Sequence, residues 1–190
     1  MCTLRYYGDP VLRKKTRNVQ DINEDTRALA QEMLAIIHER RGIGLAANQA
    51  GQTARLIVIN LSAAGEEEGE AFILVNPRVV KSSGSHTDEE GCLSFPELRL
   101  LIPRAMEVQV EAQDLSGNPV GKKARGLLAR VLQHEIDHLD GVLFIDRLPW
   151  LSRLTMLLKL PGLKRRYRQL RPPPRNHTQD ADADAEETAE

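Results

Sequence analysis

The fold of this chain is decided by one stretch, which reads Gln133-His134-Glu135-Ile136-Asp137-His138-Leu139-Asp140-Gly141. We predict that this stretch ends a helix that begins near Gly126. Residues four apart lie on one face of an α-helix, so His134 and His138 can direct two imidazoles at a single point. Glu135 lies beside the first of them. The pattern is His-Glu-x-x-His: two metal ligands and a carboxylate that can take the proton of a metal-bound water.

Surface histidines on an ordinary helix are the alternative interpretation. The apolar residues of this helix spread around most of its circumference: Leu127, Leu128, Val131, Leu132, Ile136 and Leu139. A helix that is apolar nearly all round is buried, and buried histidines and acids require partners. The pattern therefore favours a metal site. Arg130 is more polar than expected here, and we expect its charged end to reach water.

A catalytic metal site needs a third protein ligand and keeps one position for water. Cys92 is the candidate, because the other histidines fall in a helix, a polar loop and the tail: His38, His86 and His177. An inert core thiol is the alternative for Cys92. A disulfide with Cys2 is not expected, because a chain without a secretion signal meets a reducing compartment.

Length and charge limit the classes of function. The chain has 190 residues and a formal net charge of −1, enough for one domain and without the basic excess of a DNA-binding protein. No apolar run reaches the roughly 18 residues of a membrane span, and no signal peptide is evident. We expect a cytoplasmic monomer.

The rest of the chain predicts a single α+β domain in which the histidine helix packs among short antiparallel strands. A helix capped by Asn23 or Asp25 should run to about Arg40 and stop at Gly42. The expected strands are Arg55–Asn60, Ala71–Val80, Met106–Asp114, Pro119–Arg125 and a short Val142–Ile145. Asn76-Pro77 favours an edge or a bulge in the second strand, and loops are expected at 42–51, 61–70 and 81–89.

The composition changes after Pro149. Residues 151–171 hold seven Lys or Arg and no acid, and we predict a short helix broken at Pro161-Gly162. This helix either packs its leucines on the domain or docks on ribosomal RNA. Residues 172–190 are predicted to be a proline-rich linker and a disordered acidic tail. Residues 1–150 would then form the catalytic domain.

Three blocks of the sequence are Gly42-Ile43-Gly44-Leu45-Ala46-Ala47-Asn48-Gln49, Glu90-Gly91-Cys92-Leu93-Ser94 and the histidine stretch. Together they resemble the signature motifs of the peptide deformylase family. The resemblance covers about residues 4–150 and implies a peptide-deformylase-like fold. It also implies removal of the formyl group from N-terminal formyl-methionine of nascent chains, with release of formate.

The resemblance assigns a role to each matching position. Cys92, His134 and His138 would bind the metal, and Glu135 would act as general base and then general acid. The side-chain amide of Gln49 and the backbone N–H of Leu93 would stabilise the oxyanion. The resemblance implies Fe²⁺ as the metal, one per chain, whereas a thiolate and two imidazoles suit Zn²⁺, Ni²⁺ or Co²⁺ as well.

Substrate contacts are expected at further motif positions. Ile43, Gly44, Leu127 and Val131 are candidates for the pocket of the methionine side chain. Arg99, seven residues after Cys92, is a candidate contact for the substrate backbone beyond methionine.

Two other functions remain open at this point. An ordinary His-Glu-x-x-His zinc peptidase takes its third ligand downstream of the helix, but here no histidine follows His138 until His177. A metal-stabilised binding module would dock a partner through its basic helix and would leave Glu135 without a role.

Overall fold

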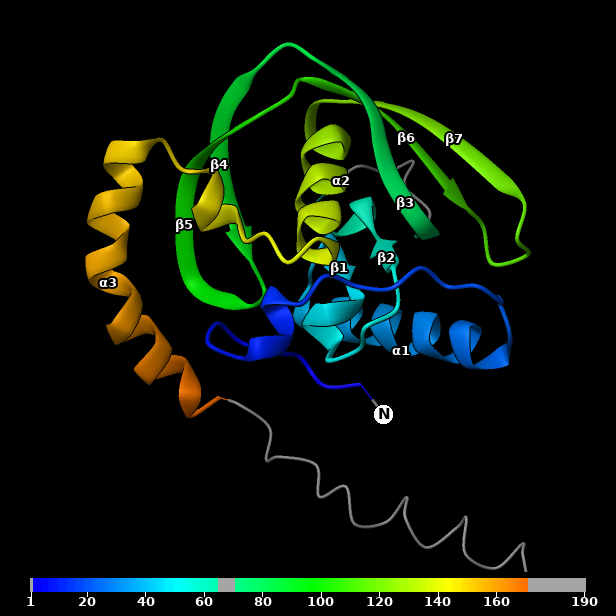
Figure 1. The fold of residues 1–190 in the computed structure, drawn as a ribbon, viewed down its shortest axis with the longest axis horizontal. Helices are drawn as coiled ribbons and strands as arrows, with labels where there is room; N and C mark the ends of the chain where they lie inside the picture. Colours follow the sequence, from blue (N-terminus) through cyan, green and yellow to red (C-terminus); the bar gives the residue numbers. More distant parts are fainter. Residues whose placement is uncertain (1, 65–70, 171–190) are drawn as a thin grey trace, which may run out of the picture.

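Helix α2 (Gly126–Leu139) runs through the middle of the molecule, with β-strands on both sides (Figure 1). A computed structural model describes residues 2–64 and 71–170. The predicted helix 126–140 is confirmed. Its apolar residues pack into a core with the strands of the sheet. The polar residues His134, Glu135 and His138 are buried as well.

A five-stranded antiparallel sheet carries most of this core, in the order β1-β2-β3-β6-β7. The strands are β1 (Gly44–Ala46), β2 (Leu56–Ile59), β3 (Phe72–Ser83), β6 (Glu107–Gln113) and β7 (Pro119–Arg125). The strands β4 (His86–Cys92) and β5 (Phe95–Arg104) form a separate antiparallel pair. Together with the helices, these sheets confirm the α+β prediction.

Helix α1 (Glu24–Arg40) begins and ends where the sequence predicted. The side chain of Asn23 accepts a hydrogen bond from the backbone N–H of Thr26 at 3.1 Å, which caps the first turn. Arg41 ends the helix in the left-handed conformation, with φ of 52°. The predicted hairpin of β6 and β7 is also confirmed, as is the bulge in β3, where the register shifts between Val75 and Arg78.

The loop predicted at 81–89 is wrong. β3 continues to Ser83, Gly84 follows with a φ of 67°, and β4 begins at His86. The side chains of 86–89 are exposed, so their polarity does not oppose a strand. Backbone pairing with β5 decides the conformation, because strand preference depends more on neighbours than on residue type.

Two other predicted elements change as well. The loop 42–51 contains β1 and a 3-10 helix, Ala47–Ala50. Val142–Ile145 is not a strand, because a 3-10 helix spans Phe144–Arg147. The carboxylate of Asp146 accepts the N–H of Leu143 at 2.9 Å and holds this tight turn. Another short helix, Leu61–Ala64, opens the predicted loop 61–70, whose residues 65–70 lie outside the described residues.

Helix α3 (Trp150–Arg168) is continuous through Pro161, so the predicted break is wrong. Proline costs a helix interior about 3 kcal/mol relative to alanine. Packing on both sides of Pro161 offsets this, since Met156 and Tyr167 are buried against an aromatic cluster that includes Phe95 and Phe144. α3 lies along the outside of the β4–β5 pair (Figure 1).

The leucines of α3 pack on the domain only in part, since Leu160 and Leu163 contact this cluster whereas those near the start of the helix do not. Five large apolar side chains near its start are between 52% and 84% exposed: Trp150, Leu151, Leu154, Leu157 and Leu158. No helix in the described part of the chain combines the length and apolarity needed to cross a bilayer. The predicted linker and acidic tail at 172–190 lie outside the described residues.

Candidate metal centre

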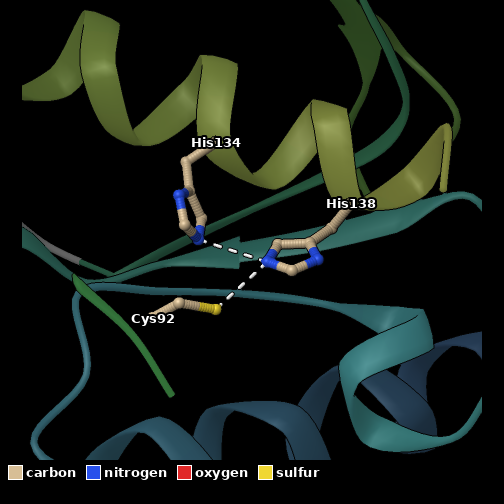
Figure 2. Close-up of side chains that lie close together, drawn as sticks. All are labelled: Cys92, His134 and His138. Carbon is tan, nitrogen blue, oxygen red and sulfur yellow. Dashed lines mark hydrogen bonds between the residues drawn. The ribbon is translucent and has the colours of Figure 1, made fainter. Parts of the chain in front are cut away.

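Cys92, His134 and His138 converge on one point, although they come from two separate elements (Figure 2). Nε2 of His138 lies 3.2 Å from Nε2 of His134 and 3.3 Å from Sγ of Cys92. All three ligand atoms lie within 4.8 Å of one another. The two cysteines of the chain are free thiols, so Cys92 is available as a ligand.

The spacing of these atoms fits a tetrahedral metal ion. Metal–ligand distances of about 2.0–2.3 Å place two ligand atoms roughly 3.3–3.6 Å apart in that geometry. Two of the three separations, 3.2 and 3.3 Å, are close to this range. Three protein ligands with one free position are typical of a catalytic site rather than a structural one.

A carboxylate behind the site holds the first histidine in place. Nδ1 of His134 donates to Oε1 of Glu90 at 2.6 Å, which leaves Nε2 facing the other ligands. Burial acts to raise the pKa of Glu90. The hydrogen bonds from His134 and Arg104 outweigh it and hold that pKa well below its ordinary value, so the carboxylate is charged.

The two histidines differ in their affinity for a proton. Burial lowers the pKa of His138 well below its ordinary value, so its ring is neutral, which is the form that binds a metal. Burial acts in the same direction on His134, but hydrogen bonds with Cys92 and Glu90 raise its pKa. Protons and metal ions compete for Nε2, so an environment that favours a proton on His134 also favours a metal cation at this point.

Glu135 is buried next to the ligands, with 4% of its surface exposed. Burial, the largest effect, raises the pKa of its carboxyl to about 7. Its Oε2 is a buried atom without a hydrogen-bond partner among the described residues, although buried polar atoms normally have one. The orphaned oxygen fits a site that is completed by a water or a substrate.

Glycine at position 44 is required by the approach of β1 to this carboxylate. A Cβ at Gly44 would lie 2.5 Å from Oε1 of Glu135. The same segment continues into Gln49, whose Oε1 accepts the backbone N–H of Ala46 at 2.8 Å. Nε2 of Gln49 then lies 3.3 Å from Oγ of Ser94 and 3.4 Å from Sγ of Cys92. The amide is therefore fixed at the metal site.

A cavity of about 670 Å³ opens in front of these residues. Its lining includes every position predicted from the motifs to act on the substrate: Ile43, Gly44, Gln49, Leu93, Arg99, Leu127, Val131 and Glu135. Cys92 and His134 line it too, whereas His138 lies behind them. The volume is within the range of small-ligand and peptide sites.

Sequence reasoning missed the charged network behind the site, and the expectation for Arg130 was wrong. Arg130 is 8% exposed, not solvated, and donates to Glu90 at 3.1 Å and to the carbonyl oxygen of Ile102 at 3.0 Å. Arg104 donates to Glu90 and also pairs with Asp137. The one feature of the sequence that pointed to this network was the position of Glu90 directly before Gly91 and Cys92.

Comparison with known proteins agrees with this geometry. The family model for polypeptide deformylase matches residues 1–153. The chain belongs to the polypeptide deformylase family.

Two curated relatives and two solved structures give the extent of the similarity. A peptide deformylase of Acidobacterium capsulatum is 44% identical over 159 residues, which cover 84% of this chain and 93% of the relative. One from Syntrophobacter fumaroxidans is 46% identical over 153 residues, covering 80% and 88%. The Legionella pneumophila peptide deformylase structure has a TM-score of 0.78 at 39% identity, covering 91% and 99%. The Thermus thermophilus enzyme has 0.81 at 39% identity, covering 89% and 98%.

Membership of this family makes the chain a metal-dependent hydrolase and confirms the predicted fold and function. It also decides between the open alternatives, since neither an ordinary zinc peptidase nor a binding module accounts for a match over residues 1–153.

Proposed function

We propose that residues 1–150 form the catalytic domain, in which Cys92, His134 and His138 hold one divalent metal ion. The reaction is the hydrolysis of the N-formyl group from formyl-methionine at the start of a new polypeptide, with release of formate. The observation that carries the assignment of ligands is the convergence of Sγ and two Nε2 atoms within 4.8 Å.

A divalent ion held by Cys92, His134 and His138 would supply a nucleophile at neutral pH, because it would lower the pKa of a coordinated water to about 7. Glu135 takes the proton from the attacking water and gives it to the departing amine, without which the C–N bond does not break. Its burial and its free Oε2 support this role.

Gln49 and Leu93 stabilise the negative charge that develops on the formyl oxygen. The amide of Gln49 is held beside Cys92, and Leu93 follows Cys92 in the chain. The side-chain amide of Gln49 and the backbone N–H of Leu93 are therefore both next to the metal-binding Cys92. A donor aimed at a developing oxyanion contributes about 3–4 kcal/mol to a transition state.

The methionine side chain enters the apolar part of the cavity formed by Ile43, Leu127 and Val131, next to Gly44. Arg99 contacts the substrate backbone beyond methionine. The support for this is that all five residues line the same cavity as Glu135.

Fe²⁺ is the metal that we propose for the native enzyme, with Zn²⁺, Ni²⁺ or Co²⁺ as substitutes. A thiolate with two imidazoles binds all four ions. In the test, separate samples of the metal-free protein are loaded with each ion under anaerobic conditions, and formate release from formyl-Met-Ala-Ser is measured. The Fe²⁺ form should be the most active and should lose activity in air; equal activity of all four forms would contradict the choice of iron.

The decisive experiment replaces Glu135. Glu135→Ala should abolish formate release from formyl-Met-Ala-Ser while the variant keeps its metal content and circular dichroism spectrum. Glu111→Ala, at an exposed site on β6 that pairs with Arg78, is the matched control and should remain active. Activity in Glu135→Ala, or cleavage of an unformylated peptide by the unchanged enzyme, would contradict the mechanism.

We also propose that the enzyme is a cytoplasmic monomer that meets its substrate at the ribosome. Every residue assigned to the site comes from one chain, so the site needs no second copy. The segment 151–171 supports a transient ribosome contact, because it combines seven basic residues with an exposed apolar face.

Ribosome contact can be tested by co-sedimentation at low and high salt, since binding to phosphates weakens steeply with salt. Lys159→Glu in α3 should reduce binding, whereas Arg78→Glu on β3, whose side chain is 71% exposed, should not. Absence of co-sedimentation at low salt would overturn the proposal.

A further inference from the structure

The mouth of the cavity has charged side chains on two sides. Arg40 and Arg41, at the end of α1, line one side. Glu89, Glu97 and Arg99, from β4 and β5, line the other. A substrate longer than formyl-methionine must leave the cavity past these residues.

Both acids at this mouth are already paired with a base. Arg99 donates to Glu89 at 3.1 Å, and Glu97 forms an ion pair with Arg166 of α3. The β4–β5 side of the mouth is therefore close to neutral.

The α1 side is not neutral. Arg40 forms an exposed ion pair with Glu39 at 3.3 Å. Arg41 has no ion-pair partner within residues 2–64 and 71–170, and it is exposed. Arg41 is thus the unmatched positive charge of the mouth.

The backbone of Arg41 is fixed even though its side chain is free. Its N–H donates to the carbonyl oxygen of His38 at 3.3 Å, and the N–H of Gly42 donates to that of Ile37 at 2.8 Å. These bonds close the last turn of α1, so the point at which the side chain of Arg41 leaves the backbone is fixed on the rim.

The distance from Arg41 to the reacting centre matches a few residues of substrate. Gly44, which touches Glu135, lies three residues after Arg41, at most about 10 Å of extended chain. β1 is an edge strand of its sheet, so its outer side can accept an extended peptide. Such a peptide advances about 3.3 Å per residue, which brings its second to fourth residues to the rim.

We propose that Arg41 makes this enzyme select formyl-methionyl chains with an acidic side chain at the second to fourth position over chains with a lysine there. The inference rests on the proposed function and adds to it a preference for one class of substrate. A lysine brings a like charge to Arg41, whereas a carboxylate gives Arg41 the ion-pair partner that residues 2–64 and 71–170 do not supply.

The expected effect is modest, because the contact is exposed. Exposed ion pairs are worth about 0.2–1 kcal/mol, so each charged peptide should differ from a neutral one by roughly 1.4- to 5-fold in kcat/KM. The difference should fall as salt is added, since the screening length decreases from about 10 Å at 0.1 M to about 3 Å at 1 M.

The test measures kcat/KM for formyl-Met-Glu-Ser, formyl-Met-Gln-Ser and formyl-Met-Lys-Ser, and for two further sets of three peptides that carry the same residues at the third or the fourth position. The metal-loaded enzyme is compared with Arg41→Asn and Arg41→Glu. Asparagine tolerates the left-handed conformation better than most residues, so the first variant removes the charge with little strain. Arg27→Gln, on the same helix roughly 21 Å away, is the control for a lost arginine.

The unchanged enzyme and the Arg27→Gln control should prefer the glutamate peptide over the lysine peptide at low salt. Arg41→Asn should abolish this preference, and Arg41→Glu should invert it. The ratio of two peptides within one variant cancels any general loss of activity. The inference would be overturned if the unchanged enzyme shows no preference between the glutamate and lysine peptides, or if both Arg41 variants leave the ratio of their kcat/KM values unchanged. Failure of the unchanged enzyme to hydrolyse the neutral peptide would instead contradict the proposed function.

Discussion

Glu90→Gln tests whether the charged network behind the metal site holds it in place. Glu90 is 6% exposed and accepts hydrogen bonds from three side chains. His134 donates at 2.6 Å, Arg104 at 2.8 and 3.1 Å, and Arg130 at 3.1 Å. Glutamine has the same shape, but it removes the charge and turns an N–H₂ group toward these donors.

The size of the effect follows from the partners that remain. Breaking a buried ion pair by removing one partner costs about 3–5 kcal/mol. Arg104 keeps its ion pair with Asp137, and Arg130 keeps the carbonyl oxygens of Ile102 and His86. We therefore expect Glu90→Gln to lower the free energy of unfolding by about 3 kcal/mol, the lower end of this range. That is a large part of the roughly 5–15 kcal/mol that stabilises a typical domain.

Metal affinity should fall with stability, because Glu90 orients His134. Loss of a carboxylate that holds a metal-binding histidine typically lowers affinity about 10- to 100-fold. The assays are urea unfolding of the metal-free protein and competition with a chelator for the metal. Glu89→Gln is the matched control, since Glu89 is the neighbouring residue in an exposed pair with Arg99 and should change stability by less than about 0.5 kcal/mol.

The pH dependence gives an independent check. Because the pKa of Glu90 in the folded protein lies below its ordinary value of 4.5, its contribution is present above pH 4.5 and decreases as the pH falls below that value. The stability difference between the unchanged protein and Glu90→Gln should shrink accordingly. If Glu90→Gln behaves like Glu89→Gln in both stability and metal affinity, the reasoning about the network is refuted.

Three further predictions concern close contacts, packing and metal removal. Gly44→Ala should lower kcat/KM at least about tenfold, because the added Cβ displaces the carboxylate of Glu135. A Cβ at Gly91 would meet its nearest atoms only at 3.8 Å, so Gly91→Ala should unfold at the same urea concentration as the unchanged protein. Equal activity of Gly44→Ala and the unchanged enzyme would contradict the close approach of β1. Tyr167→Ala should cost about 3–5 kcal/mol in urea unfolding, because a buried ring and its hydrogen bond to Pro96 at 2.7 Å are lost. Leu158→Ala, at an 84% exposed site, should cost less than about 0.5 kcal/mol, and similar values for both would refute the docking of α3. Removing the metal should lower the free energy of unfolding by about 2.7 kcal/mol relative to a sample with the ion at 100 times its Kd, and an unchanged melting temperature would argue against a bound metal.

Much of the fold was predictable because it depends on short-range patterns. The i, i+4 spacing of His134 and His138 placed both on one face of α2, and the cap at Asn23 located the start of α1. The turn between β6 and β7 was evident from its glycine and polar residues. Each of these features is settled within a few residues of the chain.

Other features could not be predicted, because their causes lie far away in the sequence. Residues 86–91 form a strand through pairing with 99–104 rather than through their own preferences. Arg130 is buried because Glu90, 40 residues earlier, neutralises it. α3 passes through Pro161 because its inner side packs on Phe95 and Phe144.

The ligand types, the proton-carrying Glu135 and the family to which they point can all be inferred from the amino-acid sequence. How these residues are held in place depends on the folded chain. The paired acids of the cavity mouth and the carboxylate behind His134 follow from contacts between segments that are separate in the sequence. A local sequence pattern indicates which residues can react. Burial and charge pairing depend on which segments come into contact when the chain folds.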